Sequence, residues 1–148
     1  MPGIIRKAKI EDLERVQQFL RRANLGTEGL TAETIASFFI KENDNEEISG
    51  TLGIEVIQGI GLLRSLVVSP GHVEEEIIDL LDKMVQLAIE KGIDRIFLAT
   101  NKAATVAFFE LLGFKRVERE ELPQEFDHSE HIRHVLNVDN SLFLKLSL

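Results

Sequence analysis

The sequence predicts a protein that contains both helices and strands (α/β, with an α+β mixed sheet). Its central mixed β-sheet is flanked by helices. Segments with apolar residues at helical spacing alternate with short segments rich in Ile, Leu and Val. The length of 148 residues fits a single domain spanning residues 1–148, with 44% apolar and 28% charged residues. The predicted order β-α-α-β-β-β-α-β-α-β-β packs most economically as a mixed sheet with helices on its faces.

The first forty residues predict one strand and two helices. Residues 4–8 form a short apolar strand, and Asp12 stands near the start of a helix that Gly26 ends. That helix carries apolar residues at helical spacing: Leu13, Val16, Phe19 and Leu20. A second helix is expected over residues 31–40, with Thr31 as its N-cap and Glu33 in its first turn.

The middle of the chain predicts three strands and a long helix. Residues 38–68 form an antiparallel meander, with polar turns at 42–46 and 58–59. A helix over residues 73–91 follows, which Gly92 ends, and one stripe of it is apolar: Val73, Ile77, Leu80, Leu81, Met84, Val85 and Ala88.

The last third predicts three further strands and a helix. Residues 93–100 form a short buried strand, and a helix over 101–114 is capped by Asn101 and stopped by Gly113. A strand over 115–123 ends at Pro123, and alternating residues after a turn at 139–140 predict a closing strand.

Charge and composition exclude several classes of function. The net charge of −8 disfavours nucleic acid and anionic membranes and favours cationic partners. Apolar runs are too short to span a bilayer, and the N-terminus lacks the features of a secretory signal. Without cysteine there is no disulfide, thiolate nucleophile or zinc–sulfur site. We therefore expect a cytoplasmic protein that binds neither nucleic acid nor membrane.

Acidic residues cluster in residues 118–130, where six carboxylates accompany a single Arg119. A charge run of this kind is either a solvated loop or a wall that attracts an amine substrate.

Three stretches resemble the GNAT superfamily of acyl-CoA-dependent N-acetyltransferases. "LLRSLVVSP" (62–70) is similar to the family's fourth strand and following turn, and "IDRIFLATN" (93–101) to its fifth strand and the Asn after it. "AATVAFFELLGFKRV" (103–117) resembles the family's next helix and sixth strand. The resemblance implies a GNAT-like fold and acetyl-CoA as co-substrate.

The resemblance also implies a location for the cofactor. In the family, pantetheine lies between the fourth and fifth strands and bonds to the fourth strand's backbone, and pyrophosphate lies at the N-terminus of the next helix. The positions implied in this chain are Leu66, Val67, Val68, Val73, Glu74, Glu76, Ile77, Ile78, Asn101, Ala104 and Phe108.

The pyrophosphate loop departs from the family pattern. Its Arg and both glycines are missing, and Glu74, Glu75 and Glu76 are consecutive. Each close like-charge contact with a phosphate costs roughly 1 to 4 kcal/mol, whereas acids in a first turn stabilise the helix itself. We expect a degenerate phosphate-binding loop with reduced affinity for acyl-CoA.

Candidate catalytic residues are few. The family's usual tyrosine acid is replaced by Phe109, and the chain contains no tyrosine, so an ordered water is the expected proton donor. Asn101 is a candidate to bond the cofactor or that water, or is simply a helix N-cap. Glu55, His134 and Glu121 are candidate general bases, each with an ordinary surface role as the alternative.

Metal binding is not expected. His128, His131 and His134 are three residues apart, which differs from the strong zinc motifs, and a loop bordering the acceptor site is favoured instead.

Two functions remain open. One is an N-acetyltransferase that acts on a small amine or amino acid, because "GFKRVEREELPQE" resembles a stretch in GNAT members that acetylate free amino acids. The alternative is a catalytically inactive GNAT-like sensor or regulatory module with weak or no CoA binding. A homodimer is also expected, through edge pairing of the apolar C-terminal strand.

Overall fold

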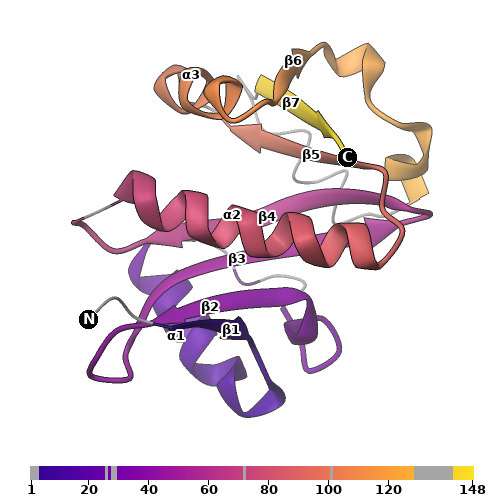
Figure 1. Ribbon diagram of the computed structural model, residues 1–148. Coiled ribbons are helices and arrows are strands. Elements are labelled where there is room, and N and C mark those ends of the chain that lie inside the picture. Colours follow the sequence, from indigo (N-terminus) through magenta and orange to yellow (C-terminus); the bar gives the residue numbers. More distant parts are fainter. Residues whose placement is uncertain (1–3, 26, 28–29, 72, 101, 129–141) are drawn as a thin grey trace. The chain divides into compact units, whose positions relative to one another are not determined.

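The computed structural model describes residues 4–25, 27, 30–71, 73–100, 102–128 and 142–148 (Figure 1). Seven strands form one hydrogen-bonded sheet in the order β1-β2-β3-β4-β5-β7-β6. Their bounds are β1 Ile4–Lys7, β2 Phe38–Glu42, β3 Ile48–Ile57, β4 Ile60–Val68, β5 Arg95–Thr100, β6 Lys115–Val117 and β7 Leu142–Ser147. The helices are α1 Leu13–Arg22, α2 Val73–Glu90 and α3 Ala103–Leu111. The predicted mixed sheet with helices is confirmed.

The chain packs as two compact units. Unit 1 contains Met1–Glu55 and Arg64–Leu87, and unit 2 contains Val56–Leu63 and Ala88–Leu148. Strands β3 and β4 and helix α2 each contribute residues to both units. The organisation as a single domain therefore stays a prediction, and each unit is described separately below.

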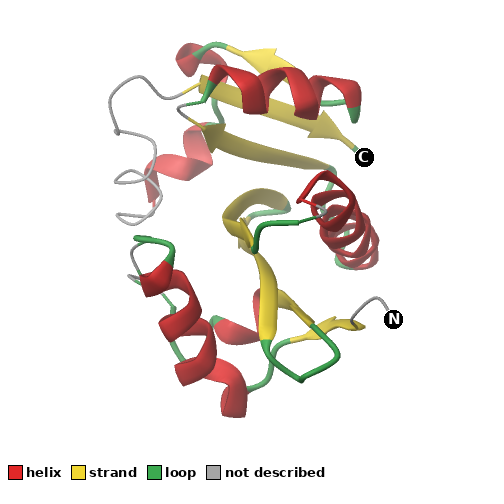
Figure 2. Ribbon diagram, turned by 90° about the vertical axis from the view of Figure 1, so that its left-hand side faces the viewer, coloured by secondary structure: helices red, strands yellow, loops and turns green. Residues whose placement is uncertain are grey.

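In unit 1, α1 and α2 lie on opposite faces of the strands (Figure 2). Strand β2 pairs antiparallel with both β1 and β3. Alternate residues of a strand point to opposite faces, so Phe38 and Ile40 pack with α1 while Lys41 points to the α2 side. On that second face an added side chain at Gly50 would touch Leu80 of α2 at 3.2 Å.

In unit 2, the start of β4 pairs in parallel with β5, and β7 lies antiparallel between β5 and β6. Phe97 of β5 and Phe126 meet edge to face, with ring centroids 5.4 Å apart. β7 pairs with β5 along its whole length and with β6 over residues 143–145, so edge pairing of the complete strand, the expected basis for a homodimer, is not open to it. The homodimer itself stays a prediction.

The predicted helix over residues 31–40 is wrong. A single 3₁₀ turn, η2 (Ile35–Ser37), is followed at once by strand β2. Thr31 is not the N-cap of η2, which is Thr34. The Thr31 hydroxyl instead accepts hydrogen bonds from the backbone N–H groups of Glu33 and Thr34, in the turn that precedes η2. Pairing of β2 with β1 and β3 outweighs local helical spacing, because Phe38 joins the core beside α1 only as a strand residue.

Most other elements confirm the predictions. The meander, α2 and α3 lie where expected, and Gly92 and Gly113 end their helices with φ of 75° and 103°. The predicted strand over 115–123 is shorter, because residues 119–121 turn into the 3₁₀ helix η3 (Arg119–Glu121). Helix α1 ends at Arg22, and Gly26 lies outside the described residues.

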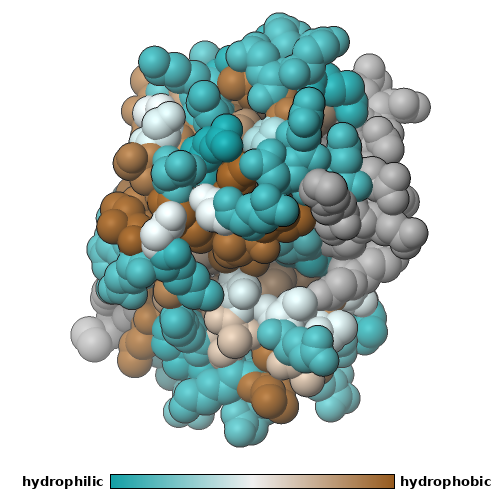
Figure 3. Space-filling view, turned by 90° about the vertical axis from the view of Figure 1, so that its right-hand side faces the viewer, coloured by the Kyte–Doolittle hydropathy of each residue, from teal (hydrophilic) through white to brown (hydrophobic). Residues whose placement is uncertain are grey.

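The surface is mixed in hydropathy. Hydrophobic side chains lie among hydrophilic ones on the face shown in Figure 3. The large hydrophobic residues that are exposed in the described chain are Ile4, Ile10, Leu25, Val56, Val73, Ile78, Ile89, Leu111 and Leu148. Exposed apolar residues are ordinary in folded proteins and by themselves indicate no partner. In the described part of the chain, no helix has the length and apolar character needed to cross a bilayer.

Candidate functional site

Three polar or charged residues of the described chain are buried: Asp12, Lys41 and Thr51. Burying a polar group is costly unless it finds a hydrogen-bonding or ionic partner. The partners of these residues, all in unit 1, show which contacts hold the fold and which shape a site.

Asp12 is the centre of a charged network. Its carboxylate accepts hydrogen bonds from both terminal nitrogens of Arg6, at 2.9 and 3.0 Å, and from the backbone N–H of Lys9 at 2.8 Å. Arg15 bonds the same carboxylate at 3.2 Å, and both arginines also bond Glu42. The network joins β1, α1 and β2. Because its charged groups bond to one another, we assign it a structural role.

This network gives stability a defined pH dependence. The hydrogen bonds from Arg6 lower the pKa of Asp12 to about 2 and lower the pKa of Glu42 as well. A depressed carboxyl pKa contributes stability that is complete above its unfolded value, near 4, and is lost as the pH falls through the folded value. We expect unfolding free energy to drop between about pH 4 and pH 2, by about 2 kcal/mol from Asp12.

Urea denaturation at pH 5 and at pH 2.5 checks this expectation. Asp12→Asn should be less stable than the wild type at pH 5 and should lose less stability on acidification. Glu14→Gln, at an exposed position of the same helix, is the matched control. Equal acid sensitivity of Asp12→Asn and the control would contradict the assignment.

Lys41 contacts the acidic first turn of α2. Its Nζ lies 3.0 Å from Oε1 of Glu76, and the two side chains are only 10% and 18% exposed. Glu74 and Glu75 are exposed, so the three consecutive glutamates have different surroundings. Glu76 lies in the first turn of the predicted pyrophosphate helix. Its negative charge is offset by Lys41 of β2.

Thr51 contacts an unusual residue of β4. Its hydroxyl donates a 2.8 Å hydrogen bond to the backbone carbonyl of Ser65. Ser65 has φ of 54°, a left-handed conformation inside a strand. Such a residue is typical of a β-bulge, and bulges are common beside active sites.

Glu55, a candidate general base, is ion-paired. Its Oε1 lies 2.6 Å from Nη1 of Arg64, whose guanidinium also lies 5.8 Å from the ring centroid of Phe38. Arg64 directly precedes Ser65 in sequence, and the pair ties β3 to β4. Glu55 therefore has a structural partner that sequence reasoning missed, and its role as a base stays a prediction.

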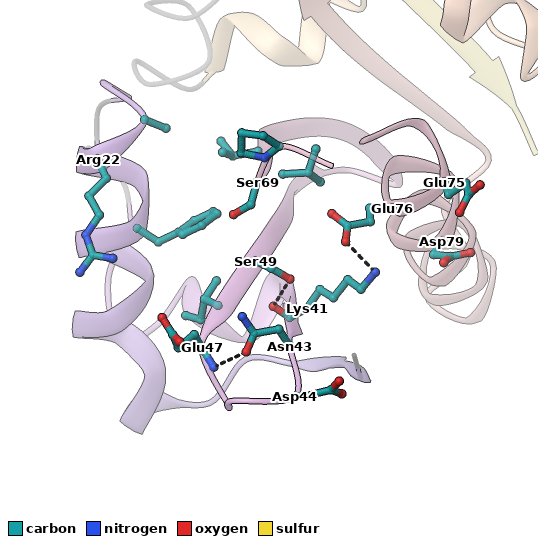
Figure 4. Close-up of a pocket in the computed structure, with 16 residues that line it drawn as sticks. Arg22, Lys41, Asn43, Asp44, Glu47, Ser49, Ser69, Glu75, Glu76 and Asp79 are labelled. Carbon is teal, nitrogen blue, oxygen red and sulfur yellow. Dashed lines mark hydrogen bonds and ion pairs between the residues drawn. The ribbon is translucent and has the colours of Figure 1, made fainter. Parts of the chain in front are cut away.

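A cavity of about 760 Å³ opens in unit 1, at the end of β4 and the start of α2 (Figure 4). Its apolar wall includes Phe19, Ile48, Val67, Val68 and Pro70. Its charged lining is mostly acidic, with Asp44, Glu47, Glu75, Glu76 and Asp79 against Arg22 and Lys41. An acidic concave surface favours a cationic ligand and opposes an anionic one.

The structure brings some of the predicted cofactor residues together. Val67, Val68 and Glu76 line the cavity. Leu66, Val73, Glu74, Ile77 and Ile78 are their neighbours along β4 and α2. Ala104 is exposed on α3 in unit 2, where Phe108 packs against Phe109 at 5.5 Å. Buried Phe109 also meets Phe114, so this residue serves the core of unit 2.

Several other predicted residues are not described by the structure. Asn101, His131 and His134 lie outside the described residues, as does the side chain of His128.

Glu121, another candidate base, is described. Its carboxylate accepts a hydrogen bond from the backbone N–H of Glu118 at 3.0 Å, a capping contact of η3. In the described part of the chain, no group of three or more His, Cys, Asp or Glu side chains is arranged to hold a metal.

The residues that sequence reasoning missed are Lys41, Thr51, Arg64 and Ser65. Their only signal in the sequence is a polar residue between apolar ones in a strand. This signal does not say which way the side chain points or what it meets.

No protein-family model matches the chain, but solved structures of acetyltransferases share its fold. Rv2747 from Mycobacterium tuberculosis, in complex with CoA and a second small molecule, has a TM-score of 0.78 at 20% identity, covering 98% of this chain and 99% of that one. A GNAT-family acetyltransferase from Staphylococcus aureus has a TM-score of 0.77 at 21% identity over 99% of both chains. The fold is that of the GNAT acetyltransferases, as predicted.

A longer enzyme contains the same fold. N-acetylglutamate synthase from Neisseria gonorrhoeae, in complex with coenzyme A and N-acetyl-glutamate, has a TM-score of 0.79 at 23% identity. The match covers 99% of this chain but only 35% of that enzyme, so this chain spans about a third of its length.

One curated relative is similar in sequence. The Bacillus subtilis (strain 168) protein YwlB is 30% identical over 142 residues, which is 95% of each chain. The chain therefore belongs to the same family as YwlB. That relative is described only as uncharacterised, so its name brings no activity with it.

Proposed function

We propose that the protein is an N-acetyltransferase that moves an acetyl group from acetyl-CoA to the amine of a small molecule. The observation that carries the proposal is the likeness over the whole chain to Rv2747 and to an N-acetyltransferase from Thermoplasma acidophilum, both of which were crystallised with CoA. The left-handed residue in β4 and the adjoining cavity support the same location of the site.

The residues of unit 1 fit the cofactor, with a weakened hold on its diphosphate. The apolar wall formed by Val67, Val68 and Pro70 suits the pantetheine arm, whose amide groups can pair with strand backbone. The first turn of α2 offers helical N–H groups to a diphosphate, and Lys41 offsets Glu76 there. Glu75 and Asp79 line the same cavity and oppose a second anion.

When bound, acetyl-CoA supplies an acyl thioester for attack by a neutral amine. The negative net charge of the protein attracts the amine in its ammonium form, and a carboxylate or imidazole must then accept its proton. Glu55, His134 and Asn101 remain the candidates to move or hold that proton. Because the chain has no tyrosine, the departing thiolate must take its proton from another donor, for which an ordered water can serve.

We propose a small amine or amino acid as the acceptor. The N-acetylglutamate synthases that share the fold were crystallised with N-acetyl-glutamate or L-arginine. The net charge of −8 favours the approach of acceptors with net positive charge over dicarboxylic amino acids.

Calorimetric titration with acetyl-CoA followed by an amine panel tests the proposal. Transfer is followed with a thiol reagent, and because the protein contains no cysteine the only reactive thiol is released CoA. We expect weak but measurable binding and faster transfer to diamines than to glutamate. Absence of both binding and transfer at millimolar acetyl-CoA would overturn the proposal.

A specific observation favours one alternative, a sensor or regulatory module without catalysis. Phe109 is a core residue at the family's usual tyrosine position, and the cavity is acidic where a diphosphate would bind. The alternative predicts that a cationic metabolite binds unit 1 without any acetyl transfer. A polyamine titration without CoA, followed by a transfer assay with the same polyamine and acetyl-CoA, distinguishes the two functions, because only the acetyltransferase releases CoA.

A further inference from the structure

Ser65 has a conformation that its place in the chain does not explain. The other non-glycine residues with positive φ in the described chain are Asn24, Glu46 and Gln58, which follow α1 or occupy the hairpin turns. Ser65 lies in the interior of β4. A left-handed serine is strained relative to glycine, and such a residue persists only where its surroundings hold it.

Thr51 is the residue that holds it. The Thr51 side chain is fully buried, with 0% of its surface exposed, and its hydroxyl bonds the Ser65 carbonyl at 2.8 Å. The residue before Ser65 is also restrained, because Nη1 of Arg64 donates a 2.6 Å hydrogen bond to Oε1 of Glu55. The backbone at Ser65 is thus restrained by the peptide oxygen and by the preceding side chain.

The stretch that follows Ser65 is the one proposed to bind the acyl-CoA arm. Leu66, Val67 and Val68 come directly after Ser65, and the two valines line the cavity. The dihedral angles of a strand residue set the direction of the residues after it, and a bulge re-aims them. The conformation of Ser65 therefore decides how the backbone of Leu66–Val68 faces the cavity.

We propose that Thr51 is a positioning residue, whose hydrogen bond to Ser65 holds the β4 backbone in the geometry that receives the acyl-CoA arm. The proposal rests on the proposed function, because it assigns Thr51 to the same site. It makes Thr51 act through Ser65 rather than by touching the cofactor. Acetyl-CoA binding should therefore depend on the Thr51 hydroxyl when residue 65 is a strained serine. It should not depend on that hydroxyl when residue 65 is a glycine.

A double-mutant cycle tests this dependence. Thr51→Val keeps the shape and removes the hydroxyl, and it should weaken acetyl-CoA binding about tenfold in calorimetry. Thr51→Ser keeps the hydroxyl and should stay within about threefold of the wild type. Ser65→Gly adopts positive φ without strain, so Thr51→Val/Ser65→Gly should recover most of the lost affinity.

The outcomes separate the possible failures. If the wild type binds acetyl-CoA and Thr51→Val binds equally well while being less stable, Thr51 is merely structural and the proposal is overturned. Failure of Ser65→Gly to rescue Thr51→Val also overturns it. If the wild type neither binds nor transfers, the proposed function itself fails.

A second variant covers the case in which Thr51→Val does not fold. Ser65→Val leaves Thr51 intact and disfavours positive φ directly, because a β-branched residue is a poor left-handed residue. It should weaken acetyl-CoA binding to a similar extent, with altered amide chemical shifts at Leu66–Val68. Unchanged affinity in this variant would overturn the proposal.

Discussion

Lys41→Met is expected to lower the free energy of unfolding by about 3 kcal/mol, because breaking a buried ion pair leaves an uncompensated charge. The Lys41 ammonium lies 3.0 Å from Glu76, and neither side chain is more than 18% exposed. The chain contains no Trp or Tyr, so urea unfolding is best followed by far-ultraviolet circular dichroism.

Two further variants distinguish the effect of breaking the ion pair from the effect of removing any lysine. Lys83→Met removes an exposed lysine from α2 and should change stability by less than about 0.5 kcal/mol. Lys41→Met/Glu76→Leu replaces both charges and should recover most of the loss, because an apolar pair carries no desolvation cost. A loss in Lys41→Met no greater than in Lys83→Met would contradict the assigned role.

Glu75→Gln/Asp79→Asn is expected to tighten acetyl-CoA binding about tenfold at low ionic strength. Both carboxylates are exposed and line the cavity at the start of α2, where a diphosphate is proposed to bind. Water screens each repulsion, so each contributes about 0.7 kcal/mol rather than the larger cost of a buried contact. Calorimetry measures the dissociation constant.

Two controls test whether the gain in affinity is electrostatic and whether it is specific to carboxylates that line the cavity. Added salt shortens the screening length, so the advantage of the variant should shrink markedly near 1 M. Asp82→Asn/Glu90→Gln removes two carboxylates from the same helix at positions that do not line the cavity, and its affinity should stay within about twofold of the wild type. An equal gain in this control would indicate a general charge effect and no specific site.

The comparison of expectation and structure is clearest in residues 31–40. Local helical spacing and a Thr31 cap predicted a helix, but the Thr31 hydroxyl bonds within a turn at residues 31–34, and a single 3₁₀ turn with Thr34 as its N-cap follows. The remaining residues become β2 because β1 and β3 offer hydrogen-bonding partners on both sides. Sequence spacing carries no information about such distant partners.

The acidic turn at the start of α2 illustrates the same limit. The three glutamates predicted a poor anion site from their order alone. In the structure Glu76 is offset by Lys41, thirty-five residues away in the chain, while Glu75 lines the acidic cavity. Equal residues in sequence thus have unequal effects, because their neighbours come from different strands.

The sequence by itself determined the mixed sheet, the long helices, the GNAT-like order of elements and the absence of a tyrosine acid. The sheet and helices follow from periodicity and glycine placement, and the lack of tyrosine from composition, which are local properties of the chain. The GNAT-like order follows from the resemblance of residues 62–70, 93–101 and 103–117 to that family. Only the tertiary structure decided that Thr51 bonds Ser65, that Arg64 pairs with Glu55 and that β7 lies between β5 and β6. Each of these depends on side-chain direction and strand register, which packing between distant segments sets.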